Sequence, residues 1–358
     1  MKKLRIALIG QGKSGRGIHG KFFLSKGNTF CDVVYVVEAD EYRRKKAAAE
    51  FGCETLTHYT ELFDKKDVDL VVNASYSHLH YPITKDLLEH GFHVLSEKPL
   101  GRSYYECMDL IHTAKKNGVL VFAFHQTLLS PSFLNVKKII ASGKLGEIHQ
   151  INIKYSEFAR RWDWQTLQSK CGGNVYNKGP HPIGMALALM NWDKTARVAF
   201  SSLSRVLTSG DSDDFAKIIL TAQDQPTVDI EVNSVDAYTG DYIFKVFGSK
   251  GTLMSTNEKY QMKYVEDFSA YPARPVIFDT MRDEKGDPIG CSEKLDFVEE
   301  SGAIEGSVFS VAVRDFYQMI YDTMFEGKEL TITPEMAAET VRIIEACHAE
   351  NPLSVEFE

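Results

Sequence analysis

The first third of the chain repeats one pattern: a short apolar run, a turn, and a stretch with helical periodicity. The apolar runs predict strands at Leu4–Ile9, Val33–Val37, Asp69–Ala74, Gly91–Ser96 and Val119–Phe124. The stretches between them predict helices near residues 43–51, 81–90 and 103–117. Strands that alternate with helices are typical of a doubly wound parallel sheet. We therefore expect an α/β domain of Rossmann type over residues 1–124.

From residue 125 the pattern changes, because strand candidates follow one another with few helices between them. These candidates cover residues 147–157, 198–203, 216–220, 227–232, 242–247 and 252–255. Helices are expected over 133–142 and from Thr333, as N-cap, through about Ala349. Residues 125–358 therefore predict an α+β domain with a large, mainly antiparallel, open-faced sheet. A second subunit is the simplest cover for its open face. Residues 266–305 are expected to have little regular structure.

A glycine-rich turn follows the first strand. Its residues are Gly10, Gln11, Gly12, Lys13, Ser14 and Gly15, with the glycines spaced G-x-G-x-x-G between a strand and a helix. Gly10 permits a tight turn, Gly12 lets a pyrophosphate approach the backbone, and Gly15 allows close helix–strand packing. The free N–H groups at the helix start favour phosphate. The turn thus predicts a dinucleotide site.

An acidic residue ends the second strand. Glu38 follows the glycine turn at close to the spacing of about 20 residues typical of a carboxylate that accepts from the adenosine ribose. A carboxylate at this place repels a 2′-phosphate, so NAD is favoured over NADP. Arg43 and Arg44 lie nearby and oppose that preference, and a solvated carboxylate without a ligand remains the alternative for Glu38.

Composition narrows the function. The chain has 358 residues, 25% charged and 44% hydrophobic, with a net charge of −8. There is no basic block interleaved with aromatic residues, so we do not expect nucleic-acid binding. No apolar run approaches a membrane-spanning length and no signal peptide is visible, so we expect a cytoplasmic protein without membrane attachment. The six cysteines are scattered and predict neither a metal site nor disulfides: Cys31, Cys53, Cys107, Cys171, Cys291 and Cys347.

Several motifs now point to one family. They are Ile9–Gly15, Ser96-Glu97-Lys98-Pro99-Leu100, Gly143–Ile148, the stretch Gly172–His181 and Phe247–Thr252. On these residues the chain resembles the Gfo/Idh/MocA family, the glucose–fructose oxidoreductase and inositol dehydrogenase group, nearly end to end. The resemblance implies a nicotinamide-dependent dehydrogenase of sugars, cyclitols or related polyols that forms a homodimer or homotetramer. It also implies a cis bond between Lys98 and Pro99.

The chain departs from the family pattern at two places. The motif D-x-G-x-H-x-x-D is common in relatives, but here Asn177 replaces its first Asp and Gly184 its last, while His181 remains. The segment that starts at Gln126 replaces N-R-R-F-x-P and lacks the arginines. The Asn177 side chain can accept or donate a hydrogen bond, but it carries no charge. Without a carboxylate beside it, His181 should be harder to protonate than in relatives that keep the Asp.

The expected site follows from these residues. Lys98 and His181 would share a substrate hydroxyl as acid–base groups, with Asn177 as an uncharged orienter. The cofactor would be held by the glycine turn, Glu38, Ser75, His80, Glu97 and Lys98, the last four at strand ends on the same rim. We expect Gln126, Tyr155, Arg160, Trp162 and Trp164 to contact substrate, although a packing or interface role explains the Arg160–Gln165 loop equally well.

Three functions remain open. The first is hydride transfer between NAD(P) and a secondary hydroxyl of a sugar, cyclitol or polyol. The second is a redox-neutral lyase or hydrolase that uses tightly held NAD. The third is a non-catalytic dinucleotide or sugar sensor on the same scaffold. Lys98 and His181 favour the first two functions, whereas Asn177 leaves the third function open.

Overall fold

A six-stranded sheet, sheet A, organises the first part of the computed structural model, which describes residues 2–274, 276–290 and 293–357. Its strands, all parallel, lie in the order β3-β2-β1-β4-β5-β6. Their bounds are β1 Leu4–Ile9, β2 Cys31–Val37, β3 Glu54–Leu56, β4 Leu70–Asn73, β5 Val94–Ser96 and β6 Val121–Ala123. This order is that of a dinucleotide-binding fold, as expected. Only the short β3 was not predicted.

Helices cover both faces of sheet A. They are α1 Lys21–Phe23, preceded by a π-helical turn at Gly15–Gly20, α2 Glu41–Phe51, α3 His80–Glu89 and α4 Tyr104–Lys116. Successive side chains of β1 point to opposite faces of the sheet. Ile6 therefore packs into the cluster that holds Phe22 and Ala47, and Ala7 into the one that holds Leu87. The Ser103 side chain caps α4 by accepting from the Glu106 N–H at 3.2 Å.

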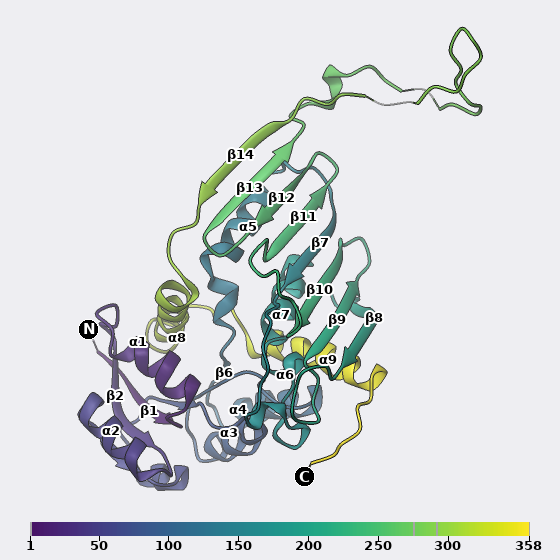
Figure 1. Ribbon diagram of the computed structural model, residues 1–358. Coiled ribbons are helices and arrows are strands. Elements are labelled where there is room, and N and C mark those ends of the chain that lie inside the picture. Colours follow the sequence, from purple (N-terminus) through teal and green to yellow (C-terminus); the bar gives the residue numbers. More distant parts are fainter. Residues whose placement is uncertain (1, 275, 291–292, 358) are drawn as a thin grey trace.

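An eight-stranded sheet, sheet B, forms the second part (Figure 1). Its order is β14-β13-β12-β11-β7-β10-β9-β8, and only the pair β7 and β10 is parallel. The strands are β7 Ile148–Lys154, β8 Arg197–Ser204, β9 Phe215–Thr221, β10 Thr227–Asn233, β11 Phe244–Gly248, β12 Gly251–Ser255, β13 Lys259–Tyr264 and β14 Val298–Ala303. The mainly antiparallel sheet is the predicted one.

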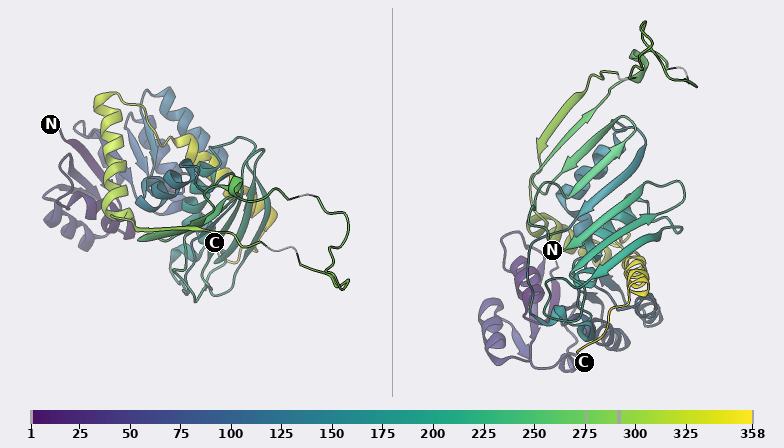
Figure 2. Two further views of the ribbon diagram at one scale, coloured as in Figure 1. Left: turned by 90° about the horizontal axis from the view of Figure 1, so that it is seen from above. Right: turned by 45° about the vertical axis from the view of Figure 1, so that its right-hand side comes forward.

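Helices lie on one face of sheet B and leave the other open (Figure 2). The remaining helices are α5 Pro131–Ala141, α6 Asn174–Asn177, α7 Pro180–Leu189, α8 Val313–Glu326 and α9 Pro334–Glu350. Phe133 of α5 packs on Phe244 of β11, with ring centroids 6.1 Å apart. The division into domains at residues 124 and 125 stays a prediction, because α9 also packs on α4 and β6 of the first part.

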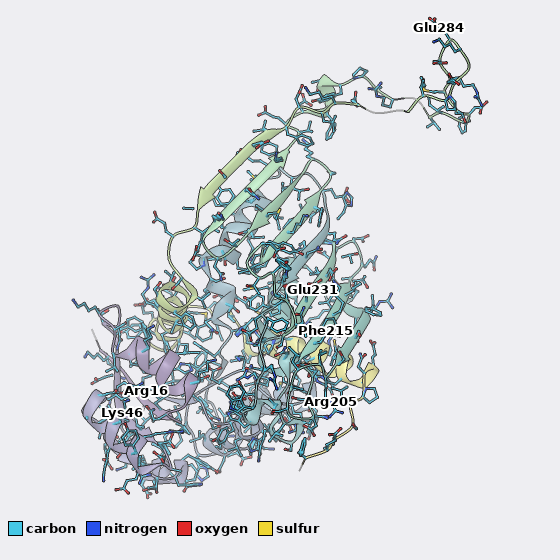
Figure 3. The ribbon with its side chains drawn as sticks, in the orientation of Figure 1. Arg16, Lys46, Arg205, Phe215, Glu231 and Glu284 are labelled. Atoms are coloured by element: carbon cyan, nitrogen blue, oxygen red, sulfur yellow. The ribbon has the colours of Figure 1, made fainter. Side chains whose placement is uncertain are left out.

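The stretch between β13 and β14 projects away from sheet B, and Glu284 lies at its far end (Figure 3). The expectation of little regular structure over 266–305 was wrong for its end, because Val298–Ala303 forms β14 against β13. A polar edge strand such as β14 carries little apolar signal of its own, and pairing with its neighbour defines it.

Two further observations concern the whole described chain. Five cysteines are unpaired thiols, namely Cys31, Cys53, Cys107, Cys171 and Cys347, while Cys291 lies outside the described residues. Among residues 2–274, 276–290 and 293–357, no helix combines the length and the apolar character needed to cross a membrane.

Candidate active site

One cavity of about 1310 Å³ joins the carboxyl edge of sheet A to β7 and its neighbours on sheet B. The glycine turn and Glu38 line it on one side, and Lys98, Asn177 and His181 line it further along. Residues that are far apart in the chain therefore meet at a single space. This is the place at which doubly wound sheets bind ligands.

The three glycines of the turn have different surroundings. A Cβ on Gly10 would lie 2.5 Å from the Ala74 carbonyl oxygen, and one on Gly15 only 1.9 Å from the Gly10 oxygen. A Cβ on Gly12 would meet no described atom within 4 Å, although Gly12 lines the cavity. The buried Gln11 Oε1 has no hydrogen-bond partner in the described part of the chain. The turn thus leaves open space at Gly12, where a dinucleotide could approach the backbone.

Glu38 closes this end of the cavity. Its Oε2 accepts from the Gln11 N–H at 2.8 Å, and its Oε1 accepts from the Asp40 N–H at 3.0 Å. Arg43 Nη1 lies 3.9 Å from Oε2 and also lines the cavity, whereas Arg44 donates to the Glu38 and Ala39 carbonyls. The carboxylate is therefore fixed beside the glycine turn, with one arginine in reach.

The turn after β5 carries Lys98. The Lys98–Pro99 bond is cis, as expected from the family resemblance. Lys98 Nζ donates to the backbone oxygen of Asn177 at 2.6 Å and to its Oδ1 at 3.3 Å. Burial lowers the pKa of Lys98, Arg161 and Lys13 lower it further, and Glu97 opposes them. The amine is thus easier to deprotonate than a free lysine.

His80 and Ser75 support this rim. His80 Nδ1 lies 2.8 Å from the Pro99 oxygen and Nε2 lies 3.2 Å from the Ser75 oxygen, while Ser75 Oγ donates to Asn73 Oδ1 at 2.7 Å. Burial lowers the pKa of His80. His80 therefore ties the segment after β4 to the turn that carries Lys98.

His181 and Asn177 come from consecutive short helices, α7 and α6, separated at Lys178–Gly179. His181 Nδ1 lies 3.1 Å from Thr127 Oγ1, and Asn177 Oδ1 accepts from Gln165 Nε2 at 3.0 Å. The pKa of His181 is well below its ordinary value, mainly because of burial, with Lys98 and His125 adding to the effect. Burial is therefore the main reason that His181 is hard to protonate, and the expected difference from relatives that carry Asp at residue 177 stays a prediction.

The expected substrate residues divide into two groups. Gln126, Tyr155 and Trp164 line the cavity, and the buried Gln126 Oε1 has no partner among the residues that the structure describes. Arg160 and Trp162 do not line it, and Trp162 is 82% exposed. For both groups of residues, contact with substrate stays a prediction.

Some cavity residues escaped sequence reasoning. Arg161 lies on the cavity wall in place of Arg160 and donates to Gln165, which in turn holds Asn177. Thr127 faces His181. Thr127 lies in the segment that departs from the pattern N-R-R-F-x-P. That departure was the only sequence feature that could have drawn attention to Thr127. Nothing in the sequence marks Gln165 as a cavity residue, and nothing in it favours Arg161 over Arg160.

Comparison with known proteins shows which family the chain belongs to. A family model described as "Oxidoreductase family, NAD-binding Rossmann fold" matches residues 4–125, and the GFO/IDH/MocA C-terminal domain model matches residues 133–254. The scyllo-inositol 2-dehydrogenase (NADP(+)) IolW of Bacillus subtilis is 23% identical over 96% of this chain and 92% of its own. The 2,7-anhydro-N-acetylneuraminate hydratase of Mediterraneibacter gnavus is 24% identical over 71% of this chain and 70% of its own.

A solved structure shows the same fold. KijD10, a 3-ketoreductase from Actinomadura kijaniata crystallised with NADP and TDP-benzene, superposes with a TM-score of 0.79 at 17% identity. The match covers 97% of this chain and 98% of that one. The two family models together span the glycine turn, sheet A, the turn that carries Lys98, and sheet B up to β12, without β13 and β14. The chain therefore belongs to the Gfo/Idh/MocA family of oxidoreductases, which has an NAD-binding Rossmann fold.

Proposed function

We propose that the protein transfers a hydride between NAD and a secondary hydroxyl of a sugar, cyclitol or related polyol. The observation that carries the proposal is the meeting of Lys98, Asn177 and His181 on the cavity that also holds the glycine turn. A hydroxyl in this cavity would have two acid–base groups beside it, both with a lowered pKa. A lowered pKa leaves a larger fraction of each group unprotonated near neutral pH, and the unprotonated form is the one that can take a proton.

The cofactor site is part of the proposal. Gly10 to Gly15 would hold the pyrophosphate, Glu38 the adenosine ribose, and Ser75, His80, Glu97 and Lys98 the nicotinamide end. The open cradle at Gly12 supports the first assignment, and the fixed carboxylate of Glu38 supports NAD over NADP. When bound, the dinucleotide supplies a two-electron hydride acceptor or donor.

The chain's own residues handle the proton. His181 or Lys98 takes the proton of the substrate hydroxyl as it is oxidised, and returns it in the reverse direction. Thr127 orients the His181 ring from its Nδ1 side, and Asn177 holds the Lys98 amine on the cavity wall. Gln126, Tyr155 and Trp164 would contact the remainder of the polyol, and Arg160 and Trp162 would do so only if their loop closes.

The test is a panel of sugars and cyclitols with NAD and NADP, followed by absorbance of the reduced nicotinamide. Turnover of a polyol with NAD supports the proposal. The alternative is a redox-neutral lyase or hydrolase, favoured by the similarity to a hydratase. That alternative predicts NAD that co-purifies with the protein and consumption of a sugar without net reduction. Cofactor binding without turnover of any sugar would indicate a sensor.

We also propose a homodimer or homotetramer formed through the open face of sheet B. Ile219 points to that face, since its neighbours Ile218 and Leu220 are fully buried on the other. Phe200 pairs with Ile219 across β8 and β9 and is 51% exposed. The substitution Ile219→Lys should lower the mass measured by light scattering, whereas an unchanged mass would argue against this interface.

A further inference from the structure

Three polar side chains from distant segments form a buried row behind Lys98. They are Tyr317 of α8, His19 of the π-helical turn after the glycine loop, and Glu97, and they are 0%, 0% and 3% exposed. Tyr317 Oη lies 2.7 Å from His19 Nδ1, and His19 Nε2 lies 3.3 Å from Glu97 Oε1. Glu97 Oε2 accepts from the Lys98 N–H at 3.0 Å. The row therefore ends at the residue that lies beside the proposed substrate hydroxyl.

The chemistry of the row assigns its protons. Burial raises the pKa of Tyr317 well above its ordinary value, so the hydroxyl stays protonated and is able to donate to His19 Nδ1. A neutral imidazole that accepts at Nδ1 carries its proton on Nε2. Glu97 Oε1 lies 3.3 Å from that nitrogen, within ion-pair distance, although neither atom has a partner with hydrogen-bond geometry among the described residues. With the tyrosine as donor, the histidine tautomer is the one that stabilises a charged Glu97.

Glu97 needs this support because it is buried. Burial by itself raises the pKa of Glu97, but the contact with His19, together with Lys98 and His80, brings it down to about 2. A carboxylate that is buried without a donor becomes neutral instead. The charge on Glu97 in turn opposes the lowering of the Lys98 pKa by burial, Arg161 and Lys13. Loss of that charge would make the Lys98 amine still easier to deprotonate.

We propose that His19 and Tyr317 are positioning residues that keep Glu97 as a charged carboxylate directly behind Lys98. Neither of them is among the described residues that line the cavity, so they act through Glu97. Through them, the helix after the glycine loop and helix α8 both control the charge beside the Lys98 amine. The inference rests on the proposed function only for the role of Lys98 in catalysis.

Other charged and titratable groups also face these residues. Lys98 has Glu97, Lys13, Arg161, His125 and His181 around it. Glu97 has His19, His80, Lys98, His125 and His181 around it, and Tyr317 has Cys31 beyond the row. Burial and Lys98 lower the pKa of His125 to about 4, so His125 stays neutral near pH 7. Among the groups named here, Glu97 is the one whose pKa is lowered by His19.

The test measures Lys98 itself, without cofactor or substrate, so its outcome does not depend on the proposed activity. Acetic anhydride is applied to the full-length protein across a range of pH, and acetylation of Lys98 is quantified by mass spectrometry. The midpoint reports the Lys98 pKa, and the plateau at high pH reports access. The variant His19→Leu should raise labelling below the midpoint by roughly three- to tenfold, about half to one pKa unit. Glu97→Gln and Tyr317→Phe should shift the midpoint in the same direction.

Two matched controls separate positioning from packing. His19→Gln keeps an N–H for Glu97 and an oxygen for Tyr317, so its midpoint should match that of the parent. Tyr321→Phe removes another tyrosine hydroxyl from α8, one that donates to the Lys2 oxygen at 2.9 Å, and should shift nothing. An unchanged midpoint in both Tyr317→Phe and Glu97→Gln would overturn the inference, as would equal shifts in Tyr317→Phe and Tyr321→Phe. If His19→Leu does not fold, these two comparisons decide the question.

Discussion

Lys98 Nζ donates a hydrogen bond to the backbone oxygen of Asn177 at 2.6 Å, although the two residues are 79 positions apart in the chain. The contact joins the turn after β5 of sheet A to helix α6, which packs beside sheet B. It also places the position at which relatives commonly carry Asp next to the lysine amine. The consequence is that the charge at residue 177 should act directly on Lys98.

The substitution Asn177→Asp tests this contact. The new carboxylate would lie near Lys98 Nζ, which is 3.3 Å from Asn177 Oδ1, and would favour the ammonium form. We expect the fold to be kept and the pH at which oxidation activity rises to increase by roughly one unit. The pH profile of kcat on the true substrate measures this shift in the pH at which activity rises. An activity lost in a correctly folded variant would contradict the proposed orienting role.

Removal of His181 tests the acid–base assignment. We expect His181→Ala to reduce kcat by roughly 10²–10⁴-fold, the usual contribution of a positioned acid–base group. Lys98→Ala should be at least as damaging, since both groups lie at the same part of the cavity. His149→Ala, at an exposed position of β7, is the matched control and should leave kcat unchanged. Near-normal turnover by His181→Ala would rule out its role.

The pH dependence of the parent follows from the two lowered pKa values. Oxidation needs an unprotonated acceptor, so activity should rise with pH and persist in mild alkali. The pKa of His181 lies well below 6.5, so this histidine is already neutral near pH 7 and the rise belongs to Lys98. Its midpoint should lie below the ordinary lysine range. A profile that falls steadily from pH 6 to pH 9 in the oxidation direction would disagree with this assignment.

Glu38 should decide between the two dinucleotides. The parent should bind NAD more tightly than NADP, because the fixed carboxylate repels a 2′-phosphate. Glu38→Ala should narrow the difference, and Arg43, which lies 3.9 Å from that carboxylate, would then be free for the phosphate. Titration of both cofactors by calorimetry measures the ratio. A parent that prefers NADP would show that Arg43 outweighs Glu38.

Two glycine substitutions should separate cofactor binding from stability. Gly12→Ala adds a methyl group to the open cradle, so it should weaken NAD binding at least several-fold with little change in Tm. Gly15→Ala forces a Cβ to within 1.9 Å of the Gly10 oxygen and should lower Tm markedly. Thermal unfolding with and without NAD measures both effects. Equal losses of Tm in the two variants would show that the cradle is packed rather than open.

Much of the fold was visible in the sequence because it depends on local signals. Apolar runs in sheet A mark strands that are buried on both faces, and β1 matches its predicted bounds Leu4–Ile9. The Ser103 cap and the glycine turn are also local, since each is defined by a few neighbouring residues. By contrast, β13, β14 and helix α8 were missed. The two strands alternate polar with weakly apolar residues and are defined by pairing, β13 with both β12 and β14, and β14 with β13.

The site divides in the same way. The sequence by itself determined the glycine turn, Glu38, Lys98 and His181, because each follows a strand or belongs to a motif with characteristic spacing. Only the tertiary structure decided that Arg161 rather than Arg160 lies on the cavity, that Thr127 faces His181, and that Gln165 holds Asn177. The row from Tyr317 to Glu97 joins residues from three distant segments. No local pattern encodes such contacts, because they arise only when two sheets and their helices pack around one cavity.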